Sequence, residues 1–274
     1  MDINLFDGLE DLGLGDMMDV SIFGDDGGKK VAELQEEAML IDKSYECFVC
    51  SSDFKCKTVR SGKAKLLSTD TDLRQKYEGI EPLKYDIVAC PECGFAAATR
   101  FFNPLSPGQV KLIREKISAN YKKQEGEKSL IDFDEAIKRY KLALANTVVK
   151  KGPDSEKAYI CLRAGWLCRS YAEEIASASV RDDEKYKSIK ALEDEFLKGA
   201  YEGFVNSRNN EIFPICGMDK ATVDYLVACL ACRFGFYDVS AKVISTLLSS
   251  SSVPPRVKDR ARDLKEELMH KVKS

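Results

Sequence analysis

Two cysteine pairs, Cys47-Phe48-Val49-Cys50 and Cys90-Pro91-Glu92-Cys93-Gly94, decide the fold of the N-terminal part of this chain, and 39 residues separate them. Two residues between paired cysteines let one tight turn direct both sulfurs at a point about 2.3 Å away, so two such turns supply the ligands of a tetrahedral zinc ion. Gly94 can adopt the positive φ that such a turn requires, whereas Ser51 follows the first pair. The sequence therefore predicts a zinc ribbon that binds one structural Zn²⁺ through Cys47, Cys50, Cys90 and Cys93.

Disulfide bonds, thiol redox chemistry and iron are the alternatives to zinc. Ten cysteines and no recognisable signal peptide favour a reducing cytosol, where paired cysteines are metal ligands or catalysts more often than disulfides. A thioredoxin-like pair needs a strand-to-helix turn in a βαβ unit, whereas the sequence around Cys47 and Cys90 has the pattern of short strands and turns. We interpret the nearby Cys56 as a strand residue, which would act as a ligand only if Cys50 did not.

The overall composition indicates a soluble protein with one large or two modest domains. The chain has 274 residues, 44% of them hydrophobic, and a formal net charge of −3, which gives no general attraction to nucleic acid or anionic membranes. The longest apolar run, near Tyr225 to Cys232, is far shorter than the roughly 20 residues of a membrane span. We therefore expect a cytoplasmic protein without a membrane partner.

Residues 1–30 form a compositionally distinct segment. Residues 1–28 contain eight Asp or Glu, six Gly and no Lys or Arg, with scattered Leu, Ile and Phe. Acidic and hydrophobic residues mixed with glycine indicate a disordered segment that orders on a partner, and a tail without a function is the alternative. Val31, Leu34, Ala38 and Ile41 then follow at helical spacing, which predicts a short helix leading into Cys47.

Residues 31–102 are predicted to form the zinc-ribbon domain, with strands between the cysteine pairs. Tyr85, Ile87 and Ala89 alternate with other residues just before Cys90, as in a strand. Residues 53–76 carry three Asp and seven cations, which are Lys55, Lys57, Arg60, Lys63, Lys65, Arg74 and Lys76. This basic face could contact phosphates, but a solvated hairpin with lysines guarding an edge strand is the favoured interpretation, because Phe54 is too little aromatic surface for base stacking.

Residues 103–274 are predicted to be helical. The turn-rich stretch 103–108 separates them from the ribbon, and Ser106, Pro107 and Gln109 predict a capped helix start. Residues 133–143 have the Ala-x-x-x-aromatic spacing of a tetratricopeptide second helix, which recurs 64 residues later at Ala200 and Phe204. Residues 235–238 would be the inter-helix turn of a third, weaker unit. A tetratricopeptide-like helical repeat is favoured over an ordinary antiparallel bundle, and the fold class is α+β, a small zinc ribbon followed by an all-α domain.

The other thiols and the single histidine give little support to an enzyme. Cys229 and Cys232 form a further C-x-x-C pair, with Cys216 upstream, but the run around them is helical and cysteine packs there as a small apolar residue, so core packing is favoured over metal or redox use. His270 falls off the apolar stripe of a terminal helix, so Ser-His and Cys-His nucleophile pairs have no second histidine to use. Four cysteines also leave a zinc ion no open position for substrate. We expect no catalytic activity and no small-molecule substrate.

Several ordered features resemble a family of uncharacterised bacterial proteins, common in clostridia and related Firmicutes, that is known only as a domain of unknown function. These features are the first cysteine pair followed by Phe54-Lys55, the block 85–97 around the second pair, and helices that end in Pro254-Pro255-Arg256. The resemblance covers roughly residues 40–270. It implies a cytoplasmic zinc-binding protein with a helical-repeat region and no assigned reaction.

The sequence favours a non-catalytic adaptor whose helical repeats bind a protein partner. The alternatives are a nucleic-acid-associated regulator that uses the basic ribbon, and a thiol-redox or zinc-responsive switch. A further expectation is that residues 1–28 dock on the helical domain near Arg139, Lys141, Arg163 and Arg169, or on a partner.

Overall fold

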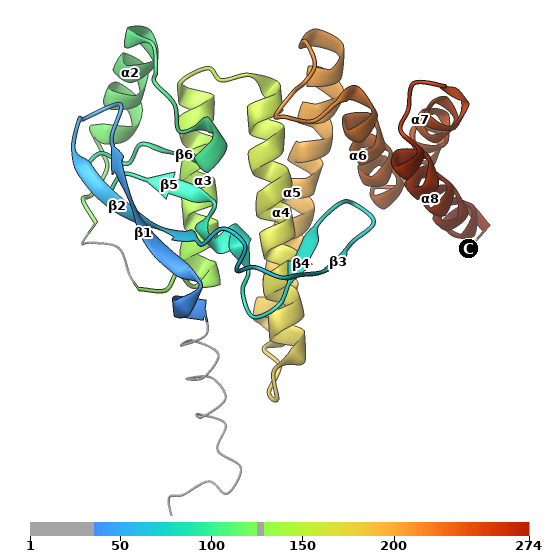
Figure 1. Ribbon diagram of the computed structural model, residues 1–274, viewed down its shortest axis with the longest axis horizontal. Coiled ribbons are helices and arrows are strands. Elements are labelled where there is room, and N and C mark those ends of the chain that lie inside the picture. The colour runs from blue at the N-terminus through green and yellow to red at the C-terminus, as the bar shows by residue number, and fades with distance from the viewer. Residues whose placement is uncertain (1–35, 125–128, 274) are drawn as a thin grey trace, which may run out of the picture.

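The computed structural model describes residues 36–124 and 129–273, and within them a strand-rich N-terminal part is followed by a helical C-terminal part (Figure 1). This arrangement confirms the predicted α+β class. The strands form three separate two-stranded antiparallel sheets, β1–β2, β3–β4 and β5–β6. Their bounds are Leu40–Glu46 (β1), Asp53–Val59 (β2), Leu66–Thr69 (β3), Gln75–Tyr77 (β4), Ile87–Ala89 (β5) and Ala96–Ala98 (β6).

The β1–β2 hairpin is the longest of the three and pairs without a bulge from Leu40 opposite Val59 to Glu46 opposite Asp53. Phe54 and Cys56 alternate with exposed residues along β2 and face the core. The helix predicted from Val31 to Ile41 differs from the structure, because residues 36–38 are helical but Ile41 lies within β1. The strand pairing of residues 40–46 overrides their helical spacing, and the earlier part of that prediction lies outside the described residues.

The predicted helix start at Ser106 is confirmed. Ser106 accepts a hydrogen bond from the backbone N–H of Gln109, whose side chain accepts one in return from Ser106 N, and Pro107 occupies the first turn. This helix, α2 (Pro107–Ile113), continues into a π-helical turn, η5 (Arg114–Ser118). The short 3₁₀ helices η3 (Pro82–Tyr85) and η4 (Thr99–Phe101) flank β5 and β6, so Tyr85 lies just before the strand in which it was expected.

The remaining helices follow one another in antiparallel hairpins. Aspartate side chains cap three of them by accepting backbone N–H groups. The turn between α6 and α7 contains Gly235 at φ +77°, as predicted, whereas Tyr237 and Asp238, which were assigned to the same turn, begin α7. The most extensive helix–helix contact is that of α4 with α5, where a methyl group on Gly165 would lie 2.6 Å from Leu197. The helices are α3 (Phe133–Val149), α4 (Asp154–Ser177), α5 (Asp183–Asn210), α6 (Lys220–Arg233), α7 (Tyr237–Ser249) and α8 (Pro255–Lys273).

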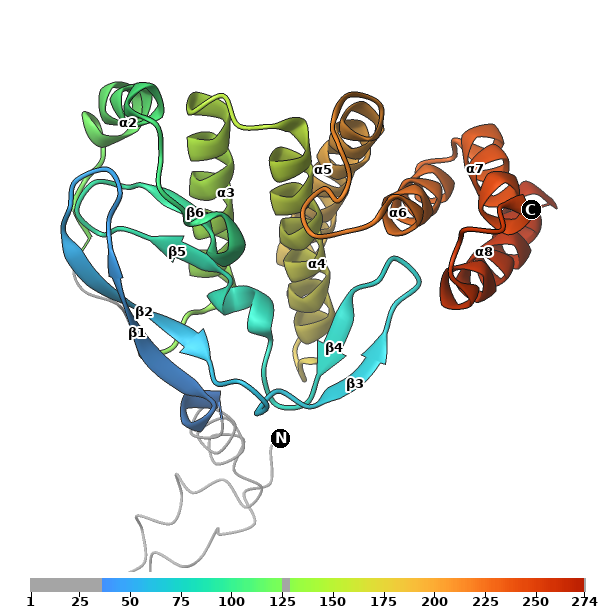
Figure 2. The ribbon, with the colours of Figure 1, turned by 45° about the horizontal axis from the view of Figure 1, so that its top comes forward.

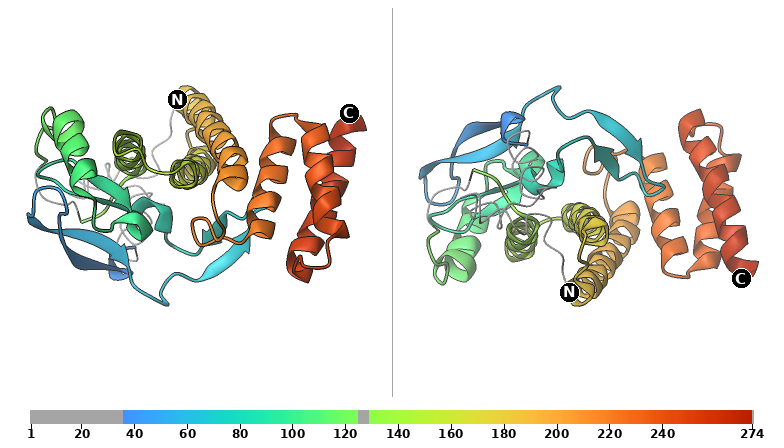
Figure 3. Two further views of the ribbon diagram at one scale, coloured as in Figure 1. Left: turned by 90° about the horizontal axis from the view of Figure 1, so that it is seen from above. Right: turned by 90° about the horizontal axis from the view of Figure 1, so that it is seen from below.

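Helices α3 to α8 form a row, and the strands lie along one side of it (Figures 2 and 3). One hydrophobic core joins the two parts, because Leu83, Ile87 and Ala98 from the strand-rich part pack into the same cluster as Tyr140 and Leu167. The sequence-based division into a ribbon domain that ends at residue 102 and a helical domain that begins at residue 103 stays a prediction. No helix among the described residues has the length and hydropathy that a membrane span requires.

Candidate metal centre

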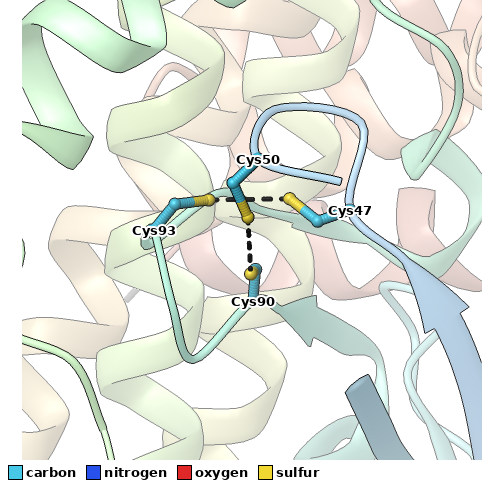
Figure 4. A group of neighbouring side chains, drawn as sticks. All are labelled: Cys47, Cys50, Cys90 and Cys93. Atoms are coloured by element: carbon cyan, nitrogen blue, oxygen red, sulfur yellow. Dashed lines mark hydrogen bonds between the residues drawn. The ribbon is translucent and has the colours of Figure 1, made fainter. Parts of the chain in front are cut away.

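The four predicted ligand cysteines come together from two chain turns, or knuckles. The first knuckle, residues 47–52, joins β1 to β2, and the second, residues 90–95, joins β5 to β6. Figure 4 shows the four side chains pointing toward one another across the space between the knuckles. Each two-stranded sheet therefore positions one pair of thiols. Together the two sheets bring cysteines that are 40 or more positions apart in the chain around a common centre.

The two knuckles have the same backbone geometry. In each one the first cysteine accepts a hydrogen bond from the N–H four residues on, and donates its own N–H to the carbonyl five residues on. These bonds are Ser51 N to Cys47 O (2.8 Å), Cys47 N to Ser52 O (3.0 Å), Gly94 N to Cys90 O (3.1 Å) and Cys90 N to Phe95 O (2.8 Å). Ser51 takes a left-handed φ of 60° and Gly94 one of 74°, so the serine adopts the conformation expected of glycine.

The sulfur positions fit a tetrahedral metal ion. Cys47 Sγ lies 3.5 Å from Cys93 Sγ, Cys50 Sγ lies 3.6 Å from Cys90 Sγ, and all four sulfurs lie within 4.8 Å of one another. Metal–sulfur bonds of about 2.3 Å in tetrahedral geometry require neighbouring sulfurs about 3.8 Å apart. The observed separations are close to that value and far longer than a disulfide bond of about 2.05 Å. The four thiols could therefore hold one metal ion.

Crowding of the four thiols perturbs their ionisation. Hydrogen bonds with Cys47 and Cys93 lower the pKa of Cys90, because they stabilise its thiolate. Hydrogen bonds with Cys47 and Cys90, followed by burial, raise the pKa of Cys93. The neighbouring thiols thus stabilise a negative charge on Cys90 and disfavour a second negative charge on Cys93. A bound cation would remove this conflict, because coordination deprotonates thiols and neutralises their charge.

Aromatic side chains cover the centre on the strand side. The ring of Phe102 lies 5.2 to 6.1 Å from four other rings, those of Tyr45, Phe48, Phe54 and Phe95. Cys47 and Cys90 are almost completely buried beneath this cluster. Cys93 is buried as well, whereas Cys50 is partly exposed, so three of the four cysteines are shielded from water.

Two side chains from the helical part hold the knuckles in place. Asn146 of α3, which is completely buried, donates its Nδ2 hydrogen bond to the carbonyl of Gly94 at 2.9 Å. Arg114 of η5 donates from Nε and Nη2 to the carbonyl of Val49 at 3.0 and 2.5 Å. These contacts were not predicted, because they join residues 52 and 65 positions apart whose types are common on helix surfaces. The centre is therefore built between the ribbon and the helices.

The other cysteines lie outside the centre. Cys56 is buried in β2 with its Sγ 4.0 Å from Ala89 O, and it does not belong to the four-cysteine cluster. Cys229 and Cys232 are buried on α6, as expected for packing residues. Cys216 donates its S–H to Ser155 O at 3.1 Å. Burial raises the pKa of Cys216 to about 11, so its thiol stays protonated near neutral pH.

Several cations of the basic ribbon are engaged by neighbouring groups. Lys57 pairs with Asp42 at 2.9 Å across the β1–β2 hairpin, and Lys65 pairs with Glu78 at 2.8 Å. Arg74 is almost fully buried and pairs with Asp70 at 2.7 Å. The excess positive charge expected for residues 53–76 is thus partly neutralised within the fold.

The fold and the site together define a class, a protein with a four-thiol candidate metal centre set between a β-ribbon and a row of helices. The chain belongs to the family described as an uncharacterized protein conserved in bacteria (DUF2225), whose model matches residues 40–268. The match confirms the resemblance inferred from the cysteine blocks. No curated protein and no solved structure matches the chain.

Proposed function

We propose that this protein is a non-catalytic, cytoplasmic adaptor in which one Zn²⁺ holds the ribbon and the helices bind a protein partner. The observation that carries the proposal is the convergence of four thiols within 4.8 Å on knuckles bound to the helices. Zinc suits a compact set of four thiolates, and four protein ligands leave no coordination position for a substrate. Its role here is to order the ribbon against the helical row.

Tetratricopeptide-like packing supports the role of the helices. Ala136 and Tyr140 on α3, and Ala200 and Phe204 on α5, are all buried, as the small-residue and aromatic positions of such repeats require. The helices follow one another as antiparallel hairpins in a row (Figure 2). A row of stacked hairpins offers an extended surface, which is how helical-repeat proteins bind other proteins.

Nucleic-acid binding remains the second candidate because the ribbon carries five cations, of which all but Lys57 are exposed: Lys55, Lys57, Arg60, Lys63 and Lys65. The ion pairs of Lys57 and Lys65 argue against a strong phosphate site. We expect RNA and DNA to bind no more tightly than the non-specific range of about 10⁻⁴ to 10⁻⁶ M at physiological salt. Sub-micromolar binding that is lost when the five cations are neutralised would replace the adaptor proposal.

A thiol-redox role or a zinc-responsive switch is the third candidate. It requires a thiol of low pKa beyond the metal ligands, whereas burial raises the pKa of Cys161 and of Cys168 to about 12. Iodoacetamide at pH 8 should therefore modify neither residue in the folded protein and both in urea. Rapid modification of either residue in the folded protein would favour the redox role.

Native mass spectrometry combined with cross-linking in the native bacterium tests the adaptor proposal. Protein purified without chelator should carry the mass of one zinc ion, and the metal-loaded protein should cross-link reproducibly to one protein partner through residues of α3 to α8. A Cys47→Ser variant should lose the metal. Metal-free wild-type protein, or cross-links that are equally abundant with unrelated proteins, would contradict the proposal.

A further inference from the structure

The turn of the β3–β4 hairpin lies against the helical row. Residues 69–73, which we call the tip, reach from the strand-rich part to α4 and α6 (Figures 2 and 3). Chain segments 94 to 158 positions apart make these contacts. The helices therefore already hold one short peptide segment, and its contacts show which chemistry this surface recognises.

Asp72 is the most completely recognised residue of the tip. Arg169 of α4 binds both carboxylate oxygens, with Nη1 2.9 Å from Oδ1 and Nη2 2.7 Å from Oδ2. Trp166 Nε1 donates a third hydrogen bond to Oδ2 at 3.1 Å. Asp72 is only 8% exposed, so these three hydrogen bonds take the place of the water molecules that would hydrate its carboxylate at the surface. This is a bidentate, aromatic-backed carboxylate site.

The neighbouring residues are recognised in a way that suits an extended peptide. Asp70 accepts a hydrogen bond from Arg169 Nη1 at 3.2 Å. Between the two carboxylates, Thr71 O accepts a hydrogen bond from Tyr225 OH of α6 at 2.8 Å. Two acidic side chains spaced by one residue thus meet α4, while the intervening carbonyl meets α6.

The helical side of this site is held by contacts of its own. Glu193 of α5 is completely buried, and its Oε1 lies 2.8 Å from both Arg169 Nε and Arg233 Nη2. Glu193 orients Arg169 whether or not Asp72 is bound, because it uses a different nitrogen of the guanidinium group. The site is therefore preorganised for a carboxylate ligand.

The groove around the tip is wider than the tip. Two cavities adjoin the tip, one of about 400 Å³ whose lining includes Arg233, Lys271 and Glu267, the ion-pair partner of Lys271, and one of about 280 Å³. The smaller cavity is lined by Arg256 and Arg260 of α8, and no carboxylate among the described residues pairs with either arginine. A longer acidic segment would find additional cations beside the site that Asp72 occupies.

The tip is joined to the fold by limited structure. The β3–β4 hairpin has three paired positions and an irregular register between Leu66 and Ser68, and the side chains of Leu66 and Leu67 are exposed. Arg74 anchors the base of the hairpin on α4, donating to Ser170 Oγ at 3.0 Å. Because a two-stranded sheet is marginally stable by itself, strand pairing within the hairpin does little to hold the tip in the groove, and the contacts with α4 and α6 do most of it.

We propose that the groove between α4, α6 and α8 is a recognition site for an acidic, extended segment of a protein partner, and that the tip occupies it as an internal ligand. The partner segment carries two carboxylates spaced by one residue, as Asp70 and Asp72 do, and further acidic residues that meet Arg256 and Arg260. The inference rests on the proposed adaptor function and identifies the surface and the partner chemistry. The partner can bind only while the tip is out of the site. Its apparent affinity is therefore its intrinsic affinity multiplied by the fraction of molecules in which the site is empty.

A labelled synthetic peptide tests the proposal in the metal-loaded full chain. The probe is a fluorescein-labelled hexapeptide with the sequence of residues 68–73, and the protein variant is Asp70→Asn/Asp72→Asn, which weakens the internal ligand without changing its shape. The peptide should bind the variant about tenfold more tightly than the wild type. The matched control, Glu115→Gln/Glu202→Gln, removes two exposed charges that make none of the tip's contacts, and it should bind as the wild type does.

Three results would overturn the proposal: no binding to the folded variant, equal binding to variant and control, or equal binding of a peptide with Asn at both Asp positions. Circular dichroism and metal content establish that the variant is folded. If peptide binding succeeds but no partner cross-links to α3 to α8, the adaptor function fails while the site stands. Successful cross-linking without peptide binding gives the opposite conclusion.

Amide exchange of the wild-type protein provides a second test that needs no variant. The N–H groups of Asp70 and Leu73, bonded to Arg74 O and Asp70 O, should exchange by local opening about 100-fold faster than buried amides of α4. Excess hexapeptide should accelerate their exchange further. Equal exchange of the tip and α4, unchanged by peptide, would show that the tip is a permanent part of the fold.

Discussion

The two cysteine knuckles of the candidate metal centre have the same turn and different surroundings. Both place the residue after the second cysteine in the left-handed region, Ser51 at φ 60° and Gly94 at 74°. Ser51 is exposed, whereas a methyl group on Gly94 would lie 2.4 Å from the ring of Tyr121. The backbone conformation alone therefore tolerates serine, and the packing of the helical part against the second knuckle requires glycine.

This comparison assigns different tasks to the knuckles. The second knuckle is bound to α3 through the buried Asn146, and the first is bound to η5 through Arg114, which is exposed. We conclude that the second knuckle joins the ribbon to the helical core, and that the first completes the ligand set from the outside. Substitutions in the two knuckles that keep all four cysteines should therefore change the free energy of unfolding by different amounts.

Loss of a ligand should have the largest effect, and at this level the knuckles should behave alike. Cys47→Ser and Cys90→Ser should both abolish metal binding and destabilise the protein by about 5 kcal/mol or more, because metal binding contributes folding free energy to a small ribbon. Elemental analysis and urea unfolding measure both quantities. A Cys56→Ser control should keep its metal, since Cys56 lies outside the cluster. Full metal content in either ligand variant would contradict the assignment.

Gly94→Ala should have the next largest effect. The added methyl group overlaps the Tyr121 ring, and alanine disfavours the positive φ, so we expect a loss of about 2–4 kcal/mol in the free energy of unfolding. Gly108→Ala is the matched control, because nothing lies within 4 Å of its methyl position and its φ is not positive. If both substitutions are neutral, Tyr121 does not pack on the second knuckle.

Removing the side chain that binds each knuckle to the helical part should destabilise the protein by different amounts. Asn146→Ala leaves a buried carbonyl of Gly94 without its donor and should cost about 1–3 kcal/mol. Val49 is buried too, but Arg114 is an exposed side chain that water can replace beside Val49 O, so Arg114→Ala should cost about 1 kcal/mol or less. Thermal and urea unfolding of the metal-loaded variants give the order. A larger loss for Arg114→Ala would reverse the tasks that we assign to the knuckles.

Ser51→Gly should have the smallest effect. Glycine relieves the strain of the left-handed conformation but adds entropy to the unfolded chain, so we expect stabilisation of at most about 1 kcal/mol. The same urea unfolding measurement applies, with Ser52→Gly as a control outside the positive-φ position. A loss above 1 kcal/mol for Ser51→Gly would mean that the serine side chain has a role the turn geometry does not explain.

Local patterns in the sequence were sufficient to predict a helix start and the four cysteines that converge in the fold. The C-x-x-C spacing places both sulfurs of a knuckle, and Ser106, Pro107 and Gln109 specify a helix start, because each signal acts within a few residues. The helical spacing around Ile41 predicted the wrong element, since the pairing of Ile41 with Thr58 is not local. The ribbon and the helices share one hydrophobic core, and no short stretch of sequence indicates this either, because the residues in contact are far apart in the chain.

The predicted groove cations illustrate the same limit. Arg163 and Arg169 were expected to receive residues 1–28, which lie outside the described residues, but Asp86 and Asp72 pair with them. Spacing along a helix predicts which face a cation occupies. It does not predict which distant carboxylate lies opposite.

X-ray absorption spectroscopy at the zinc edge, on protein purified without chelator, decides whether the two knuckles hold one metal ion between the ribbon and the helices. We expect one zinc ion per chain with four sulfur neighbours at about 2.3 Å, and loss of that signal in Cys90→Ser. Absence of zinc, a first coordination shell with nitrogen or oxygen neighbours, or disulfide bonds between the four cysteines would contradict it.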